Sequence, residues 1–312
     1  MPKPYKTALV TGGAGFIGSH IADALIARRM KVYIIDDLST GKRRNLHPKA
    51  VFYKMSVTNP KVGEVIREVK PDIIIHAAAQ QDVRASVNDP RRDAKVNIFG
   101  TLNLLDAAVD VKVRKSIFLT TGGAMYPNVG KPPFSEKIPA DPMSPYAIAK
   151  LACEYYFRFY FEQHGLPYTA LRLANVYGPR QDSSPLGGVI SIFANKLLSE
   201  EQVTINGDGK QTRDYVFVED VVNAVLLAID SDFVGVCNIG TGKQTSLVQL
   251  FRLMNKLTRA KAKENYGKSK QGEVMKSALD ASLAKKVLGW KPQMPLEEGV
   301  HQTLEWFEDF GG

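Results

Sequence analysis

The chain contains little cysteine and no long apolar run. Only two of its 312 residues are cysteine, Cys153 and Cys237, and both have apolar neighbours. A disulfide framework needs more cysteines than this, so we expect a protein of a reducing compartment, the cytoplasm. No apolar stretch approaches the roughly 20 residues of a membrane-spanning helix, and no leader-like segment precedes the first strand-like stretch. We therefore expect no membrane partner.

Nucleic-acid-binding signatures are also missing. The formal net charge is +9, but the basic residues are spread along the chain and alternate with acidic ones. The densest basic stretch, residues 259–270, is typical of a solvated loop, although one or two of its lysines could contact an anionic substrate. Without a helix-turn-helix, zinc-finger or RNA-binding pattern, we expect no nucleic-acid partner. We also expect no metal site.

The order of apolar segments indicates an α/β fold. Alternating strand-like and helix-like segments with continuously apolar strands predict a parallel sheet covered by helices on both faces, a Rossmann-type doubly wound sheet. The expected strands are residues 6–10, 31–35, 50–53, 72–76, 115–120 and 168–173, and the expected helices are the segment from residue 15 and residues 62–69, 93–108 and 146–163.

The rhythm changes beyond residue 178. We predict a larger domain over residues 1–178 and a smaller mixed lobe over residues 179–312, with the chain free to cross back between them. The smaller lobe is expected to contain helices at 187–198, 246–257 and 296–307, a strand at 202–205, a turn at 206–209, and a strand end followed by a helix at 216–229. Ser246 is the expected N-cap of its helix.

A glycine-rich segment after the first strand predicts a dinucleotide site. Gly12, Gly15 and Gly18 give the spacing G-x-x-G-x-x-G between a strand and a helix. Such glycines allow the tight turn, the approach to a pyrophosphate and the packing of helix on strand. The second strand ends at Asp36, whose carboxylate would accept hydrogen bonds from the ribose hydroxyls and repel a 2′-phosphate. The cofactor expected from this pattern is NAD rather than NADP.

Tyr146 and Lys150 predict chemistry at that cofactor. They stand in Ser-Pro-Tyr-Ala-Ile-Ala-Lys, and residues four apart on a helix share one face. A nearby ammonium favours the phenolate, so we expect Lys150 to lower the pKa of Tyr146 towards neutrality. Such a tyrosine can take a proton from a sugar or alcohol hydroxyl. Together with the dinucleotide segment, the pair indicates hydride transfer.

Taken together, these features resemble the extended short-chain dehydrogenase/reductase family. Within it, the chain is most similar to the nucleotide-sugar epimerases of the UDP-glucose 4-epimerase type, over essentially its whole length. The segments that carry the resemblance are residues 10–20, 36–41, 76–80, 97–101, 144–150, 175–181, 213–216 and 288–290.

The resemblance implies an activity. It is the NAD-dependent 4-epimerisation of a UDP-hexose, UDP-glucose or UDP-galactose and also their N-acetylated counterparts, through a transient 4-keto sugar. Alternatives within the resemblance are 4-epimerisation of a UDP-uronic acid, another nucleotide-sugar oxidoreduction, or a non-catalytic NAD-binding role. The family usually dimerises through helices equivalent to residues 93–108 and 146–163, so a homodimer is implied.

The resemblance also assigns residues to roles. Tyr146 is implied as the catalytic base and acid, Lys150 as its partner on the nicotinamide ribose, and Thr121 as a second hydroxyl. The implied cofactor contacts are Gly12, Gly15, Phe16, Ile17, Gly18, Asp36, Asp37, Ser39, Thr40, Gly41, Ser56, Val57, Ala77, Ala78, Ala79, Gln80, Asn97, Thr120, Tyr146, Lys150 and Leu173. The implied substrate contacts are Thr121, Gly122, Gly123, Tyr146, Asn175, Gly188, Val189, Thr204, Asn206, Arg213, Lys270, Glu273 and Ser277.

Several positions depart from the family pattern. Gly122 stands where the family usually has the Ser or Thr that bonds the reacting hydroxyl, so either Thr121 takes that role or Tyr146 works without it. Gly123 and Ala124 stand where the related dehydratases carry an Asp-Glu pair, which argues against water elimination. Other departures are Ser56 for an adenine-binding Asp, Lys270 for a diphosphate-binding Arg, Glu273 for Asp, and Ser277 for a bulky residue that excludes N-acetylated sugars in some epimerases.

Overall fold

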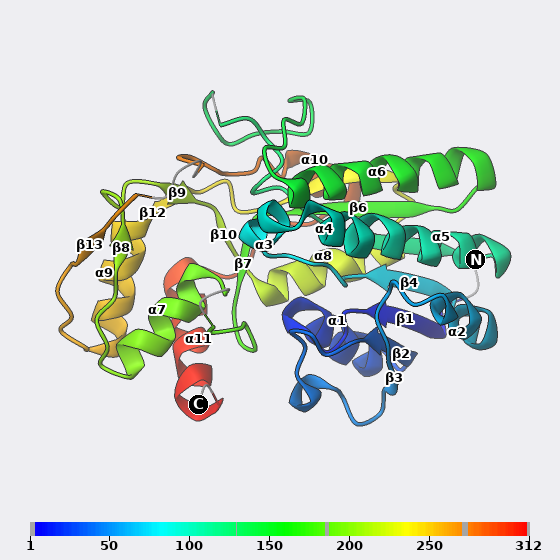
Figure 1. Cartoon of the computed structure of the whole chain (residues 1–312), viewed down its shortest axis with the longest axis horizontal. Helices are drawn as coiled ribbons and strands as arrows, with labels where there is room; N and C mark the ends of the chain where they lie inside the picture. Colours follow the sequence, from blue (N-terminus) through cyan, green and yellow to red (C-terminus); the bar gives the residue numbers. More distant parts are fainter. Residues whose placement is uncertain (1–3, 129, 185–186, 270–273, 311–312) are drawn as a thin grey trace.

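A seven-stranded parallel sheet forms the centre of the larger lobe (Figure 1). The computed structural model describes residues 4–128, 130–184, 187–269 and 274–310. The strand order is β11-β6-β5-β4-β1-β2-β3. The strands are β1 (Thr7–Thr11), β2 (Lys31–Asp36), β3 (Val51–Lys54), β4 (Ile73–His76), β5 (Lys115–Thr121), β6 (Tyr168–Leu173) and β11 (Gly235–Ile239).

Helices cover both faces of this sheet and form two separate cores. One face packs against α1 (Phe16–Ala27), α8 (Val218–Asp230) and α10 (Ser282–Leu288). The other packs against α2 (Lys61–Val69), α5 (Gly100–Asp110) and α6 (Pro145–His164). Because the strands are buried on both faces, they are apolar at successive positions. The predicted doubly wound α/β fold is confirmed.

The predicted helix at 93–108 is interrupted. The chain runs through α3 (Val83–Asn88), α4 (Pro90–Ala94), the π-helical turn η2 (Lys95–Phe99) and then α5. Asp82 caps α3, and Asp89 caps α4, through their side-chain oxygens. Apolar periodicity predicts one regular helix here. A single π-helical turn is too short to be recognised from that pattern.

The smaller lobe is built around three helices, which lie to the left in Figure 1. They are α7 (Val189–Leu198), α9 (Leu247–Thr258) and α11 (Leu296–Phe310), and they share one core. Ser246 caps α9, as predicted, because its side chain accepts a hydrogen bond from the backbone of Gln249. The strand expected at 202–205 is shorter and later, because only β8 (Ile205–Asn206) forms there.

Short strand pairs join the two lobes and complete the smaller one. The remaining strands are β7 (Asn175–Tyr177), β9 (Thr212–Arg213), β10 (Tyr215–Phe217), β12 (Thr245–Ser246) and β13 (Tyr266–Gly267), and a short 3₁₀ turn covers Arg43–Asn45. They pair as β7 with β10, β9 with β12 and β8 with β13. Strand β11 returns to the edge of the large sheet from beyond residue 178. The domain boundary itself stays a prediction.

The described residues contain neither a membrane-spanning helix nor a metal-binding cluster. No helix among them combines the length and apolarity needed to cross a membrane. Nor do these residues bring three or more His, Cys, Asp or Glu side chains together in a group that could hold a metal ion.

Candidate active site

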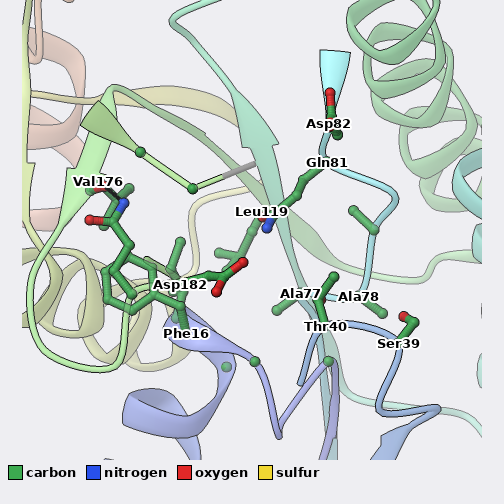
Figure 2. Close-up of a pocket in the computed structure, with 18 of the residues that line it drawn as sticks. Phe16, Ser39, Thr40, Ala77, Ala78, Gln81, Asp82, Leu119, Val176 and Asp182 are labelled. Atoms are coloured by element: carbon green, nitrogen blue, oxygen red, sulfur yellow. Dashed lines mark hydrogen bonds between the residues drawn. The ribbon is translucent and has the colours of Figure 1, made fainter. Parts of the chain in front are cut away.

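A cavity of about 660 Å³ lies where the strands of the large sheet end, facing the smaller lobe. Figure 2 shows Ser39, Thr40, Ala77 and Ala78 at one end and Val176 and Asp182 at the other. Parallel strands present their carboxyl ends at one edge, so residues far apart in the chain meet there. The predicted residues in its wall are Gly12, Gly15, Phe16, Ile17, Gly18, Asp36, Asp37, Ser39, Thr40, Ser56, Val57, Ala77, Ala78, Ala79, Thr120, Thr121, Tyr146, Lys150, Leu173, Asn175, Gly188, Val189, Thr204 and Asn206.

The glycine turn leaves the start of α1 open towards the cavity. Gly12 has a φ of +72°, and a Cβ there would lie 2.7 Å from the backbone nitrogen of Ala78. Gly15 is the N-cap of α1 and offers no side-chain cap to the first turn. The amides of Phe16 and Ile17 therefore remain available, and the helix dipole adds a positive potential. This geometry suits a phosphate group.

Asp36 ends β2 beside that turn. Its Oδ2 accepts a hydrogen bond of 3.0 Å from the amide of Ala14, and its Oδ1 accepts one of 2.8 Å from the amide of Leu38. Burial raises the pKa of its carboxyl above the usual value, although these amides oppose that effect. Gly41 does not line the cavity but packs behind Asp36, since a Cβ there would lie 2.8 Å from Oδ1.

Tyr146 and Lys150 project from the first turns of α6. Ser144 caps this helix by accepting a hydrogen bond of 3.2 Å from Ala147, and Pro145 occupies the first helical position, where its missing N–H costs nothing. The ammonium of Lys150 donates 2.9 Å to the carbonyl of Leu119 and lies 4.6 Å from the ring centre of Phe118. Tyr146 and Lys150 both line the cavity.

The expected lowering of the Tyr146 pKa is wrong for this structure. Burial, with a smaller contribution from the carboxylate of Asp93, raises the pKa of Tyr146 above its ordinary value. Burial also lowers the pKa of Lys150 to about 8, against the favourable carboxylates of Asp93 and Glu154. Loss of water therefore outweighs the neighbouring ammonium. Tyr146 is protonated at neutral pH until more positive charge is brought close to it.

Thr121 and Gly122 lie at the end of β5 and just after it. The sequence leaves open whether Thr121 takes the role of the Ser or Thr that the family usually has at position 122. Thr121 lines the cavity, whereas Gly122 and Gly123 do not. The amides of both glycines turn back to the carbonyl of Leu173. A Cβ on Gly122 would overlap the side chain of Leu279. A serine or threonine at 122 would therefore displace a buried leucine, and of the two positions only Thr121 presents a hydroxyl to the cavity wall.

Gln80 and Asn97 support the cavity from behind. Asn97 accepts from the amide of Gln80 and donates to its carbonyl, both at 3.0 Å. Both side-chain amides also donate to Oδ1 of Asp93. Neither lines the cavity. Their hydrogen bonds thus connect the loop after β4 to the π-helical turn. Direct contact of Gln80 or Asn97 with the cofactor stays a prediction.

Two of the predicted substrate residues, Arg213 and Ser277, lie outside the cavity wall. Arg213 donates to the carbonyls of Thr212 and Val274 and does not line the cavity. Ser277 is buried, and its amide donates to the carbonyl of Thr212 at 3.3 Å. Lys270 and Glu273 lie outside the described residues.

Sequence reasoning missed several charged and polar residues of the wall. They are Lys42, Gln81, Asp82, Arg84, Arg180, Gln181 and Asp182, and Figure 2 shows Gln81, Asp82 and Asp182. Arg180 forms an ion pair of 2.7 Å with Asp23 on α1. The available signal was position, because these residues directly follow the segments after β2, β4 and β7 that were already assigned to the site.

Comparison with known proteins identifies the family. The model of the "NAD dependent epimerase/dehydratase family" matches residues 8–240. The chain belongs to this family. The match spans the glycine turn, Tyr146, Lys150 and β11, and it includes the whole of the large sheet except Thr7 at the start of β1.

The chain is also similar to individual relatives over its whole length. It is 41% identical to the UDP-glucose 4-epimerase of Mycolicibacterium smegmatis over 307 residues, which is 96% of this chain and 98% of that one. The Thermotoga maritima UDP-glucose 4-epimerase with UDP-glucose has a TM-score of 0.96 and 45% identity, covering 98% and 100% of the two chains. The Thermus thermophilus UDP-glucose 4-epimerase complex with NAD has a TM-score of 0.92 and 37% identity, covering 97% and 99%.

The residues of this chain fit NAD. The turn at Gly12 has no room for a Cβ, and the uncapped start of α1 suits a pyrophosphate. Asp36 places a carboxylate where the adenosine ribose would lie, and its oxygens retain acceptor capacity beside the two amides that they already bind. A 2′-phosphate would be repelled there, which favours NAD over NADP.

Proposed function

We propose that this protein is an NAD-dependent 4-epimerase of UDP-hexoses that interconverts UDP-glucose and UDP-galactose. One observation carries the proposal: a single cavity is lined by the phosphate-binding glycine turn, by Asp36, and by the Tyr146–Lys150 pair. Cofactor-binding and proton-transferring groups thus face the same space. The similarity to UDP-glucose 4-epimerases over nearly the whole chain supports the same activity.

Tyr146 moves the proton. In this proposal its phenol oxygen takes the proton of the sugar 4-hydroxyl and later returns it. NAD held at the glycine turn and Asp36 would supply the hydride acceptor for carbon 4 and a positive charge beside the phenol. Because burial raises the pKa of Tyr146, this charge and that of Lys150 are needed to favour the phenolate. Thr121 offers a hydroxyl to the same oxygen of the sugar.

The substrate is held by its nucleotide end. Asn175, Val189, Thr204 and Asn206 line the part of the cavity contributed by the smaller lobe and its connection. Firm binding of UDP leaves the hexose able to turn about its diphosphate bond once carbon 4 is a ketone. Hydride can then return to the opposite face, and no net oxidation results. Such conversion would give the protein a role in galactose metabolism.

The direct experiment uses the purified protein without added cofactor. UDP-galactose is supplied, and the products are separated by chromatography, with a parallel sample that contains added NAD. Formation of UDP-glucose supports the proposal, and its formation without added NAD further indicates a retained cofactor. No product in either sample contradicts it and favours a binding role for the site.

A UDP-uronic acid is the second candidate substrate. Arg84 lines the cavity next to the Asp82 cap of α3, and a guanidinium pairs well with a carboxylate. UDP-glucuronic acid therefore belongs in the same assay. Faster conversion of UDP-glucuronic acid than of UDP-galactose would make the uronate the preferred substrate.

N-acetylated sugars are a further part of the proposed substrate range. Ser277 stands at the position where some epimerases carry a bulky residue that excludes them, and it is small and buried beside Thr212. Ser277 does not line the cavity, so this part of the proposal rests on the resemblance and on the small size of the side chain. We expect UDP-N-acetylgalactosamine to be converted as well.

The proposed assembly is a homodimer. Large apolar side chains are exposed along α6 and the neighbouring helices, and they include Ile148, Tyr155, Phe159 and Phe99. Contiguous exposed apolar surface on a folded protein usually marks an interface. A second copy of this chain is the proposed partner. Because both cysteines of the chain are free and buried, we place the protein in the reducing cytoplasm.

A further inference from the structure

Three buried polar residues lie side by side just inside the carboxyl edge of the sheet. Thr120 on β5 pairs in register with Arg172 on β6, and Arg172 pairs with Asn238 on β11. All three are buried. Directly opposite residues of neighbouring strands point to the same face. The row stands one residue before Thr121, which lines the cavity.

Glu154 connects this row to the helix that carries the catalytic pair. It lies on α6, one turn beyond Lys150. Its carboxylate accepts bonds of 2.7 and 3.1 Å from the guanidinium of Arg172 and one of 3.0 Å from the hydroxyl of Thr120. The neighbouring carbonyl of Leu119 accepts from Lys150. The end of β5 is therefore hydrogen-bonded to α6 at two successive residues, Leu119 and Thr120.

Tyr126 connects the same row to the loop between β5 and α6. Its hydroxyl accepts 3.0 Å from Arg172 and donates 2.8 Å to the side chain of Asn238. Asn238 also donates 3.0 Å to the carbonyl of Phe134 and, through its backbone amide, 2.6 Å to Glu136. Four groups from the sheet, helix and loop thus share one buried network.

The first residues of this loop are held to β6 only through their backbone, because the amides of Gly122 and Gly123 donate to the carbonyl of Leu173. Gly122 and Gly123 follow Thr121, and a Cβ at Gly122 would overlap Leu279. No side chain at either glycine can hold the loop against the sheet. Among the described residues that follow Thr121, Tyr126 is the first whose side chain forms a hydrogen bond to the sheet.

We propose that Glu154, Arg172, Tyr126 and Asn238 form one positioning unit that fixes the hydroxyl of Thr121 relative to the phenol of Tyr146. None of the four lines the cavity, so they act through the residues that do. The inference rests on the proposed epimerase function, in which those two hydroxyls meet the same sugar oxygen. A displacement of about 1 Å in such a site can slow the reaction about 100-fold.

The test compares two tyrosine-to-phenylalanine variants. Tyr126→Phe removes the hydroxyl that joins Arg172 to Asn238. Tyr160→Phe is the matched control, since Tyr160, near the C-terminal end of α6, is also buried and its hydroxyl donates to Asp106 on α5. For each variant we would measure kcat and KM with UDP-galactose and the isotope effect of deuterium at carbon 4.

The positioning unit predicts a specific pattern. Tyr126→Phe should lower kcat about 10- to 100-fold with KM changed less than about 3-fold, and raise the isotope effect, because hydride transfer becomes slower. Tyr160→Phe should leave all three near the wild-type values. A merely structural role would reduce the active fraction without changing the isotope effect, and that result would overturn the proposal.

Two further controls keep the outcome decisive. If Tyr126→Phe folds poorly, Asn238→Ser replaces it, since serine is too short to accept from Tyr126, and the same pattern is expected. An unchanged kcat in a folded variant would also overturn the proposal. Wild-type protein that does not convert UDP-galactose would count against the proposed function itself, so the two failures can be told apart.

Discussion

At the scale of single residues, the proposed proton transfer depends on the environment of Tyr146. The sequence correctly suggested that Tyr146 and Lys150 share one site, because four-residue spacing places both on one helix face. It gave the wrong direction for the pKa of Tyr146. Burial by surrounding segments raises that pKa, and burial depends on tertiary packing that a local pattern does not contain.

Replacement of Tyr146 by phenylalanine tests its role as the base. Tyr146→Phe should reduce kcat by about 100- to 10,000-fold, the usual contribution of general acid–base catalysis. The cofactor should remain bound, because the phosphate and ribose contacts lie on the glycine turn and Asp36. Turnover is measured with UDP-galactose, and cofactor content by absorbance after denaturation. A variant that keeps most of its activity would remove Tyr146 from the mechanism.

Replacement of Ser277 tests the substrate range. Ser277→Tyr should abolish conversion of UDP-N-acetylgalactosamine and leave conversion of UDP-galactose within about 3-fold, because the added ring is proposed to fill the space that an N-acetyl group needs and a hydroxyl does not. Both substrates are assayed on the same preparation. Equal loss for both would show that Ser277 does not select for the N-acetyl group.

At the scale of elements, the strands and long helices of the large sheet could be predicted, but the connections around the cavity could not. Apolar strands and amphipathic helices carry their own signals. The π-helical turn at Lys95–Phe99, the short α3 helix and β11 have weak local patterns. Their positions are set by contacts between residues far apart in the chain. For the π-helical turn, one such contact is the hydrogen bond from the amide of Gln80 to Asn97. Arg84 on α3 and Asp182 in the loop after β7 line the cavity. They were missed because the path of these connections has no local sequence pattern.

Gly18, in the first turn of α1, should tolerate no side chain, because it packs against the turn that follows β1. Gly18→Ala would place its Cβ over the carbonyl of Gly12, so we expect loss of bound NAD and destabilisation by more than about 2 kcal/mol, as for other overpacked sites. Gly289→Ala is the control for backbone strain without overlap, because Gly289 has a φ of +69° and nothing lies within 4 Å of an added Cβ. It should cost only about 1 kcal/mol and retain the cofactor. Thermal unfolding and cofactor content are measured for both, and retained NAD in Gly18→Ala would contradict the assigned turn.

His76 should make the fold sensitive to acid. It ends β4, bonds to Thr11 on β1 and Thr101 on α5, and its burial lowers its pKa to about 3. Between that value and the ordinary 6.5, the unfolded chain binds a proton that the folded chain does not. The free energy of unfolding should therefore fall as pH decreases through this range, by up to about 1.4 kcal/mol per pH unit.

Denaturant unfolding at several pH values measures this effect. His76→Gln keeps the hydrogen-bonding groups of the side chain but cannot be protonated, so its stability should depend less steeply on pH between those limits. An identical slope in both proteins would show that His76 is not responsible.

At the scale of the whole molecule, the exposed apolar face of α6 should bind a second copy. Phe159 and Tyr155 are 49% and 64% exposed in the single chain. Phe159→Glu with Tyr155→Glu should convert a dimer to a monomer, because unpaired charges cannot be buried cheaply at an interface. Light scattering after gel filtration gives the mass. Phe310→Glu, an exposed aromatic at the end of α11, should leave the dimer intact, and a wild-type monomer would contradict the proposed assembly.

The central claim concerns the whole reaction, in which a hydride leaves carbon 4 and returns to the same carbon. The most direct measurement supplies UDP-galactose labelled with deuterium at carbon 4, in ordinary water, and analyses the UDP-glucose by mass spectrometry. We predict that the deuterium remains at carbon 4 of the product. Deuterium carried by a bound nicotinamide would not exchange with water before it returned to the sugar. UDP-glucose that has exchanged its deuterium for a solvent proton would contradict it.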